Sequence, residues 1–455
     1  MFSRGVLDHL EKSCPEAVMV RAALENALPP EIVDQVFHEN SKRQYQRTLL
    51  FSTIVQLLGL VVCRVRPSLH AAFQLCAEQV GTTVRAVYDK LNKTEPAISM
   101  ALVHRAYERM AAVVGKLKAK RPPLVAGYRT RLIDGNHLAA TEHRLTPLRQ
   151  ISSGPLPGVA VVVFDRELEL IESVDVAEDA YTQERQIVIE TLGRAQANDL
   201  WIADRNFCTA GVLWQLDGVD AAFVIRRHSI NVRYQTKGRM RKLGRTETGT
   251  VYQQSILIED DFGGTMPARL VRVTLDKPTR DGDPHIELLT NLPNHVSGLR
   301  VADAYRTRWD IEVTFAEIRK ILSGEIGSLG HPRAALLAFC LALIAYNALS
   351  MIKSAMRATH GSKKVDEEVS LYYVAHNVQS EWRALEVFAD VNDWIARFSR
   401  LTPTQLAKYL KHVSQQLNLT RLQKHARGPK KPQPPRTHNS RKPHVSTSRL
   451  LKLRT

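Results

Sequence analysis

The spacing of apolar residues predicts helices at both ends of the chain and a mixed helix-and-strand region between them. From the N-terminus to about residue 120, apolar positions recur at helical spacing, and prolines at Pro15 and Pro29 mark helix boundaries. Beyond Tyr128, short apolar runs bounded by turn residues replace that spacing. They predict strands at Arg131–Ile133, Val159–Phe164, Leu168–Val174, Leu200–Ala203 and Ala221–Ile225. With a helix at 182–197, these strands predict an α/β sheet with mixed strand directions.

Two short predicted helices in the N-terminal region flank a glycine. They cover Ser68–Gln79 and Thr83–Leu91, with Gly81 in the turn between them. This is the outline of a helix-turn-helix, a motif that binds DNA through its second helix. Many helical bundles contain such a pair without binding DNA, so the high basic charge of the chain is what favours DNA binding here. Three basic side chains are expected to face outward: Arg85, Lys90 and Lys93.

One segment is apolar enough to raise the question of a membrane span. Ala334–Ile352 holds 19 residues without a charge, which is near the length of a helix that crosses a bilayer. It is rich in alanine, contains Tyr346 and Asn347, and starts after a proline as a soluble helix would. We predict a buried core helix and no membrane partner, and a membrane span is the alternative.

The positive charge of the chain is concentrated toward its C-terminal end. The net charge is +17 and the isoelectric point is about 9.7, values that suggest a polyanionic partner such as nucleic acid. Residues 421–455 contain 11 Lys and Arg, five Pro and no acidic residue, so they supply most of that charge. Such a segment buries too little apolar surface to fold alone, and we predict a disordered basic tail.

A second basic run interrupts the α/β pattern. Arg226–Arg245 holds eight Lys and Arg and no acidic residue. A charge run is usually a solvated surface, but these cations would repel one another without counter-charges, and a phosphate backbone would relieve that repulsion. Three more strands are predicted after it, at Val251–Ile258, Arg269–Leu275 and Ile286–Thr290. We predict a β-rich insertion with a basic rim.

The cysteines and the N-terminus bear on the compartment. The five cysteines show no CxxC spacing and no paired framework, so they are expected to be free, mostly buried thiols of a reducing cytoplasm. The first residues contain no apolar signal core. We therefore expect a cytoplasmic protein.

The most informative stretch is Ala304–Lys320, which we predict to be one helix. At 3.6 residues per turn, the side chains of four residues fall in one narrow sector beside a separate apolar stripe: Tyr305, Arg308, Glu312 and Arg319. A carboxylate between arginines and a tyrosine can hold a hard cation and phosphate. A solvated helix face with an Arg308–Glu312 ion pair is the alternative.

Three acidic residues stand where α/β sheets present functional groups. Asp134 ends the first predicted strand, Asp204 ends a later one, and Glu312 lies on the helix after the insertion. Carboxylates that converge require a cation, and oxygen ligands suit Mg²⁺ or Mn²⁺ better than zinc. Two such ions activate a water or a hydroxyl and stabilise the leaving oxygen of a phosphodiester. Taken singly, Asp134 and Asp204 are also ordinary turn residues.

Residues 128–352 resemble the catalytic domain of the DDE transposases of bacterial insertion sequences, in the cut-and-paste group marked by a Tyr-Arg-Glu-Lys signature. The matching residues are Asp134 in LIDGN, Asp204 in WIADRNF, and Tyr305, Arg308 and Glu312 in YRTRWDIE. The β insertion between the second Asp and the Glu also matches. The resemblance implies a ribonuclease H-like core and a two-metal phosphodiester mechanism.

The resemblance also implies a role for each matching residue. The catalytic metal ligands, for two Mg²⁺ or Mn²⁺ ions, would be Asp134, Asp204 and Glu312. Tyr305 and Arg308 would contact phosphate near the cleaved DNA end. The Lys of the signature is replaced by Arg319, which can hold phosphate but is not equivalent to Lys. Some relatives stack a flipped base on an aromatic residue of the insertion, and the candidates here are Tyr234, Tyr252 and Phe262.

The expected fold class is α/β, with a ribonuclease H-like mixed sheet, a β-rich insertion and an all-helical N-terminal domain. The expected boundaries are 1–125 for a helical domain that recognises DNA ends, 126–360 for the catalytic domain with its insertion at about 227–292, 361–420 for C-terminal helices and 421–455 for the tail.

The expected function is that of a DNA transposase, which cleaves the ends of its insertion sequence and joins them to target DNA. Its partner would be double-stranded DNA, and the pairing of two ends implies a homodimer, located in the cytoplasm at the nucleoid. Two alternatives are a non-catalytic DNA-binding relative and a nuclease that cuts without joining.

Overall fold

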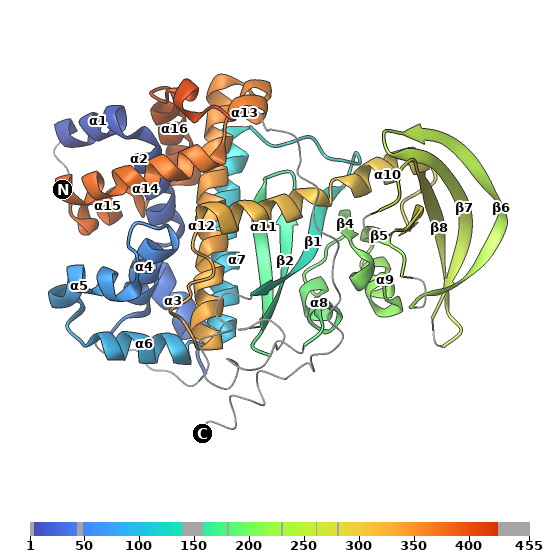
Figure 1. Ribbon diagram of the computed structural model, residues 1–455, viewed down its shortest axis with the longest axis horizontal. Helices are drawn as coiled ribbons and strands as arrows, with labels where there is room; N and C mark the ends of the chain where they lie inside the picture. Colours follow the sequence, from blue (N-terminus) through green and yellow to red (C-terminus); the bar gives the residue numbers. More distant parts are fainter. Residues whose placement is uncertain are drawn as a thin grey trace.

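The computed structural model describes residues 4–42, 49–138, 158–179, 182–228, 231–260, 262–279 and 282–425. Helices from both ends of the chain lie together on one side, and a nine-stranded sheet extends away from them (Figure 1). Strands from the predicted insertion form the far end of that sheet.

The N-terminal part is helical, as its apolar spacing predicts. Prolines open three of these helices at positions where a missing N–H leaves no hydrogen bond unmade. The helices are α1 (Arg4–Ser13), α2 (Pro15–Ala27), α3 (Pro30–Asn40), α4 (Phe51–Val62), α5 (Leu69–Val80), α6 (Val84–Lys93) and α7 (Pro96–Leu117).

Helices α5 and α6 form the predicted pair around Gly81, which adopts a left-handed conformation at φ 60°. The Thr83 hydroxyl accepts a hydrogen bond from the backbone of Ala86 and caps α6. Arg85 and Lys93 are exposed as predicted. The prediction for Lys90 was wrong, because its ammonium group donates to the backbone carbonyl of Leu49.

The nine strands have the order β3-β2-β1-β4-β5-β9-β8-β7-β6. Strands β1, β4 and β5 are parallel neighbours, and the other pairs are antiparallel. The strands are β1 (Arg129–Leu138), β2 (Gly158–Asp165), β3 (Leu170–Ala177), β4 (Asp199–Ala203), β5 (Ala222–Arg226), β6 (Arg233–Thr246), β7 (Gly249–Glu259), β8 (Thr265–Leu275) and β9 (His285–Thr290). The insertion therefore continues the central sheet, and its outermost strand β6 was not predicted.

Alternate residues of the central strands pack into two different cores. Leu132 and Ile202 lie on the face that joins the core of the N- and C-terminal helices. Ile133 and Ala203 lie on the opposite face, which packs against α8 (Glu184–Leu192) and α9 (Ala210–Asp217). Asp134 and Asp204 follow these pairs, so the pleat directs both aspartates toward the face of Leu132 and Ile202.

Helices resume after β9 and surround the long central helix α12. They are α10 (Gly298–Arg306), α11 (Trp309–Ile321), α12 (Pro332–His360), α13 (Ser362–Glu368), α14 (Leu371–Phe388), α15 (Val391–Phe398) and α16 (Pro403–Ser414). Among the described residues, α12 alone is long and apolar enough to cross a membrane, and its most apolar window is wholly buried inside the protein. A buried core helix can be equally long and apolar, so the buried position of α12 favours the predicted core helix over the membrane span.

The N- and C-terminal helices share one hydrophobic core. The side-chain amide of Asn26 on α2, for example, donates to the backbone carbonyls of Phe398 and Leu401, each at 2.9 Å. The first residues of the predicted basic tail also join this core: Leu422 is fully buried, and its carbonyl accepts from the backbone of Ser370. Residues 426–455 lie outside the described part of the chain.

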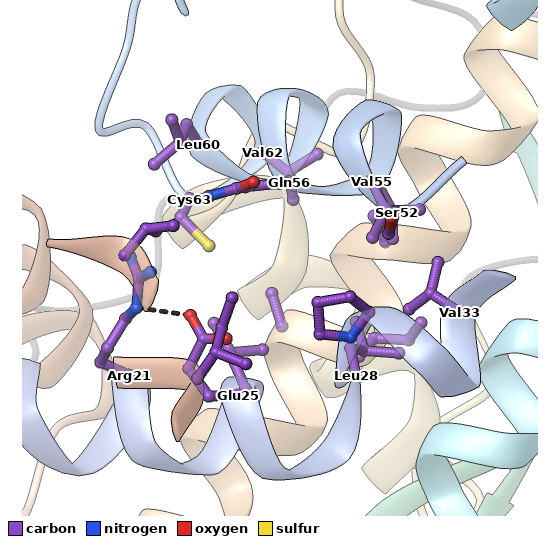
Figure 2. A pocket seen from close by; sticks show the side chains of 18 of the residues that line it. Arg21, Glu25, Leu28, Val33, Ser52, Val55, Gln56, Leu60, Val62 and Cys63 are labelled. Atoms are coloured by element: carbon purple, nitrogen blue, oxygen red, sulfur yellow. Dashed lines mark ion pairs between the residues drawn. The ribbon is translucent and has the colours of Figure 1, made fainter. Parts of the chain in front are cut away.

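A cavity of about 250 Å³ lies between α2, α4 and the C-terminal helices (Figure 2). It is lined mainly by apolar side chains, together with an ion pair of Arg21 and Glu25 at 2.6 Å. Burial raises the pKa of Glu25, and the charge of Arg21 opposes that rise. The guanidinium also lies 5.1 Å from the centre of the Trp382 ring.

Candidate active site

The parallel pairing of β1 with β4 brings the two predicted aspartates together. Ile133 pairs with Ala203 as the last pair of this ladder, and the next residues are Asp134 and Asp204. Asp204 follows the end of β4, as predicted. Asp134 does not end its strand, and that prediction was wrong: β1 continues to Leu138 because β2 still pairs with it there. Asp134 thus lies where one neighbour of β1 ends and the other continues.

The stretch from Ala304 to Lys320 is two helices and not the single helix that we predicted. Helix α10 ends at Arg306, and α11 begins at Trp309. The backbone N–H of Thr307 donates to the carbonyl of Ala304, in the tighter pattern that ends α10. Thr307 and Arg308 keep right-handed helical angles, so the chain turns in the same direction through the break. The angular order of the side chains is therefore preserved.

All four side chains of the predicted sector reach the sheet at one place. The Tyr305 hydroxyl donates to Oδ1 of Asp204 at 3.1 Å. The Arg308 guanidinium lies 2.6 Å from Oε1 of Glu312 and 3.6 Å from Oδ2 of Asp134. Farther along α11, Arg319 donates to the side-chain oxygen of Asn136, two residues after Asp134, at 3.3 Å. The six predicted site residues thus form one cluster on the face covered by α10 and α11.

Burial and charge act against each other in this cluster. Burial raises the pKa of Asp134 to about 7, and the charge of Glu312 adds to the rise while Arg308 opposes it. Burial disfavours the charged form of Arg308, but the nearby Tyr305, Asp204, Glu312 and Asp134 raise the pKa of its guanidinium above the ordinary value. Burial, followed by the charge of Asp204, also raises the pKa of the Tyr305 hydroxyl. The site therefore favours a cation next to its carboxylates.

Arg226 also belongs to this cluster, although the sequence pattern marked it only as part of the basic run. It ends β5, the parallel strand next to β4, and its guanidinium lies 4.0 Å from Oδ1 of Asp204. The same guanidinium donates to Asp283 at 2.6 Å. Its place at the carboxyl end of a predicted parallel strand was a usable signal, since Asp204 was selected by that criterion.

Glu184 approaches the site from the opposite face of the sheet. It is the first residue of α8, and its carboxylate lies against the backbone of Gly135, next to Asp134. Asn206, two residues after Asp204, donates to Oε2 of Glu184 at 3.4 Å. No sequence pattern pointed to Glu184, because its position depends on how α8 packs against β2 and β3.

The donor set suits a hard divalent cation, but an arginine separates two of the donors. Asp134, Asp204 and Glu312 offer carboxylate oxygens, which are the ligands that Mg²⁺ and Mn²⁺ prefer. Within the described ranges, however, no three His, Cys, Asp or Glu side chains gather closely enough to hold one ion. The Arg308 guanidinium lies between Asp134 and Glu312 instead.

The basic run of the insertion is partly paired in three dimensions. Arg226, Arg227 and Arg245 form ion pairs with Asp283, Glu287 and Asp276, so the absence of counter-charges expected from the sequence was wrong for these three. Four other cations lie exposed on β6, and no ion pair to them is seen among the described residues: Lys237, Arg239, Arg241 and Lys242. This exposed group on an edge strand is the part of the rim that can meet phosphate.

Exposure now distinguishes the aromatic candidates for base stacking. Phe262, in the turn between β7 and β8, is 97% exposed. Tyr234 is partly covered by the Arg227 guanidinium, 4.9 Å from its ring centre. Trp309 lies outside the insertion, yet it is 62% exposed and directly follows Arg308. Trp309 is therefore an exposed aromatic residue next to the cluster.

A mixed sheet that gathers two aspartates, a glutamate and several arginines at one edge is consistent with a ribonuclease H-like enzyme acting on nucleic acid. Comparison with protein families leads to the same class: residues 126–348 match the family described as "Transposase DDE domain". The match covers the sheet, the insertion and the helices up to α12. It supports a transposase function and implies DNA binding. A comparison with curated proteins found no match.

Proposed function

We propose that the protein is a DNA transposase of the cut-and-paste group, which cleaves the ends of its own element and joins them to target DNA. The observation that carries the proposal is the convergence of Asp134, Asp204 and Glu312 from three separate elements. Each contacts a member of the Tyr305–Arg308 pair. A purely structural role would not require these residues to meet just beyond the paired ends of two parallel strands.

The proposed reaction needs divalent ions held by the three carboxylates. Bound Mg²⁺ or Mn²⁺, as two ions, would activate the attacking water or 3′-hydroxyl and stabilise the leaving oxygen. Tyr305, Arg308 and Arg319 would hold the phosphate of the DNA strand in place. Because the attacking group is a water and then a DNA hydroxyl, no protein side chain has to act as a nucleophile.

The proposed partners follow from this reaction. Element ends and target DNA are both double-stranded, and we propose that the exposed cations of β6 contact their backbones. The pairing of two ends implies a homodimer. We further propose that the protein works in the bacterial cytoplasm at the nucleoid.

Two other functions use the same surfaces. A regulatory relative would bind DNA without cleaving it, and a nuclease would cut without joining. Carboxylate oxygens are the ligands that a hard cation prefers, and this chemistry favours catalysis over the first. The distinction from a nuclease depends on whether insertions form.

An excision assay tests the proposal. The gene and its native flanking DNA are placed on a plasmid, and the wild type is compared with Glu312→Gln. Glu317→Gln, on the same helix, is the matched control. Repaired donor sites with the wild type and the control, but not with Glu312→Gln, support transposition. Excision that survives Glu312→Gln contradicts the proposal. Ends that are cut but never inserted support the nuclease.

A further inference from the structure

The three carboxylates of the active site are already paired with groups of the protein itself. Arg308 bridges Asp134 and Glu312, at 3.6 and 2.6 Å. Asp204 accepts the hydrogen bond of Tyr305 and lies 4.0 Å from Arg226. The negative charge that would attract a divalent ion is therefore largely neutralised by arginines.

Arg308 lies where an ion shared by Asp134 and Glu312 would have to lie. Its guanidinium is attracted to the same carboxylate oxygens that would ligate the ion, and the residue is only 9% exposed. An arginine does not lose its proton in a protein, so it can leave these carboxylates only by moving. The three carboxylates do not gather at ligand distance in this arrangement, and the guanidinium lies between two of them, Asp134 and Glu312.

The hydrogen bonds of Arg308 are incomplete in this position. Its Nε–H is buried, and no acceptor for it lies among the described residues. Aromatic rings flank the guanidinium, with the centre of Tyr305 at 5.9 Å and that of Trp309 at 5.7 Å. A phosphate offers several oxygens to one guanidinium, which makes it a strong competitor for Arg308. Trp309 itself is 62% exposed, so solvent reaches the side chain next to the guanidinium.

We propose that Arg308 takes the place of the metal ion in the DNA-free protein and moves onto a DNA phosphate when an element end binds. Metal and DNA then bind cooperatively. A bound phosphate draws Arg308 away from the carboxylates and frees them for metal, and a bound metal ion displaces Arg308 and frees it for phosphate. The inference rests on the proposed function, since it assumes that these carboxylates bind metal. As a consequence, the enzyme should show little metal-dependent cleavage of DNA other than the element ends.

The first test measures Mn²⁺ binding to the DNA-free protein by calorimetry. Arg308→Gln is compared with wild type and with Arg319→Gln, which removes the same charge from α11 but contacts Asn136 and, among the described residues, no carboxylate. We expect Arg308→Gln to tighten Mn²⁺ binding by at least about tenfold, the scale of one close charge interaction. Arg319→Gln should change it by much less. Equal effects of the two variants overturn the inference.

Two further variants keep the outcomes distinct. Asp134→Asn in the Arg308→Gln background must abolish the tight Mn²⁺ site; if it does not, the metal site of the proposed function is wrong. If Asp134→Asn abolishes binding but Arg308→Gln behaves like Arg319→Gln, only the further inference fails. Should Arg308→Gln not fold, as judged by its unfolding transition, Arg308→Lys replaces it. A lysine cannot bridge both carboxylates with one planar group, so it should still tighten Mn²⁺ binding relative to wild type.

The reciprocal test measures DNA binding. By thermodynamic linkage, metal must increase DNA affinity by the same factor as DNA increases metal affinity. A labelled duplex that spans the DNA flanking the gene is titrated with wild type and Arg308→Gln, with Ca²⁺ or with EDTA, at constant ionic strength. Ca²⁺ should strengthen binding several-fold for wild type and have little effect on the variant. No effect of Ca²⁺ on wild type overturns the inference.

Discussion

Gly135 is held between two site residues and has no room for a side chain. A Cβ atom at this position would lie 2.0 Å from Oε1 of Glu184. Backbone pairing of β1 with β4 ends at Ile133 and Ala203, so it does not itself fix Asp134 relative to Asp204. The contacts of Glu184 with Gly135 and with Asn206 join the two segments beyond that point. Glu184 is therefore placed to position both aspartates.

A double-mutant cycle tests this positioning role. Gly135→Ala should push Glu184 away and lower the rate of DNA cleavage by roughly tenfold or more, as is typical for groups that orient metal ligands. In a Glu184→Ala background the clash is gone, so Gly135→Ala should have little additional effect. The cleavage rates of the four proteins are measured together with their DNA affinity. Additive effects would show that Gly135 and Glu184 act independently.

Substitution of any of the three carboxylates should abolish DNA cleavage without loss of DNA binding. Asp134→Asn, Asp204→Asn and Glu312→Gln are each expected to reduce cleavage to background, because each removes a carboxylate that we propose as a metal ligand. DNA binding should be retained or slightly strengthened, since the lost negative charge repels phosphate. A gel-shift titration beside the cleavage assay checks this. Joint loss of both activities together with a lower unfolding midpoint would point to misfolding instead.

At the residue scale, much of the cluster was predictable from sequence. Tyr305, Arg308, Glu312 and Arg319 were placed together by helical geometry, and the error about one continuous helix did no harm because Thr307 and Arg308 keep helical angles. Glu184 was not predictable in this way. Its approach depends on the packing of a helix that is remote in sequence and shows no pattern of its own.

Among the elements, α12 does more than fill the core, because it completes the edge of the sheet. Strand β3 is the first strand of the sheet order, and no strand of the described residues lies beyond it. The Asn347 side chain of α12 accepts from the backbone N–H of Ile171 at 2.7 Å and donates to its carbonyl at 2.8 Å. The Ser350 hydroxyl donates to the carbonyl of Glu169 at 2.6 Å. Side chains of a helix thus replace the hydrogen bonds of a missing strand.

Replacing Asn347 should destabilise the protein strongly. Asn347→Ala leaves the buried N–H and C=O of Ile171 without partners, and each unpaired group costs about 1–3 kcal/mol. We expect the free energy of unfolding to fall by about 3 kcal/mol. Ser354→Ala is the control, since this buried hydroxyl on the same helix has no hydrogen-bond partner within the described part of the chain. Urea denaturation of the two variants should therefore differ clearly, and equal stabilities would contradict the edge-completing role.

Asn347 also illustrates which helices and strands could be predicted from the sequence. A run of apolar residues predicted α12 well, and Asn347 within it argued for a protein interior over a membrane. Strand β6 was missed for the opposite reason. It is an edge strand whose side chains are mostly exposed, so no alternation of apolar and polar residues marks it. The continuation of β1 past Asp134 was missed because only its pairing with β2 maintains the strand there.

At the scale of the whole molecule, helices from the N-terminal and C-terminal parts of the chain bring two carboxylates near each other. Burial raises the pKa of Glu381 on α14 to about 7, and the charge of Glu16 on α2 adds to the rise, while Arg421 opposes it. The folded protein therefore keeps a proton on Glu381 that the unfolded chain has lost between about pH 4.5 and pH 7. The free energy of unfolding must fall as the pH rises through this window, because the unfolded state binds fewer protons.

Glu381→Gln should remove this pH dependence. The amide stays neutral, so the variant is expected to be more stable than wild type at pH 8 by about 2 kcal/mol and similar to it at pH 5. Guanidinium denaturation at both pH values measures the difference. Glu386→Gln, on the same helix, is the charge-matched control. A constant difference between Glu381→Gln and wild type across this pH range would contradict the assignment.

Two basic regions of the chain are candidates for contact with DNA. The salt dependence of DNA affinity can show how much each region contributes. One is the exposed group on β6, and the other is the segment after His425, which contains nine Lys and Arg and no acidic residue. Deletion of residues 426–455 leaves the buried Leu422 in place, so the fold should survive. Each phosphate contact that is lost lowers the slope of log affinity against log salt by about 0.9.

We expect the deletion to weaken binding to every duplex and to reduce this salt slope by several units. The slope should also fall when Gln replaces four residues of β6: Lys237, Arg239, Arg241 and Lys242. This fall should not exceed the loss of about four phosphate contacts. Fluorescence anisotropy at a series of salt concentrations gives both slopes. Since the two regions are separate in the chain, the effects should add when the changes are combined. If the deletion leaves the slope unchanged, the C-terminal segment does not neutralise phosphate, and the folded surfaces must carry the binding.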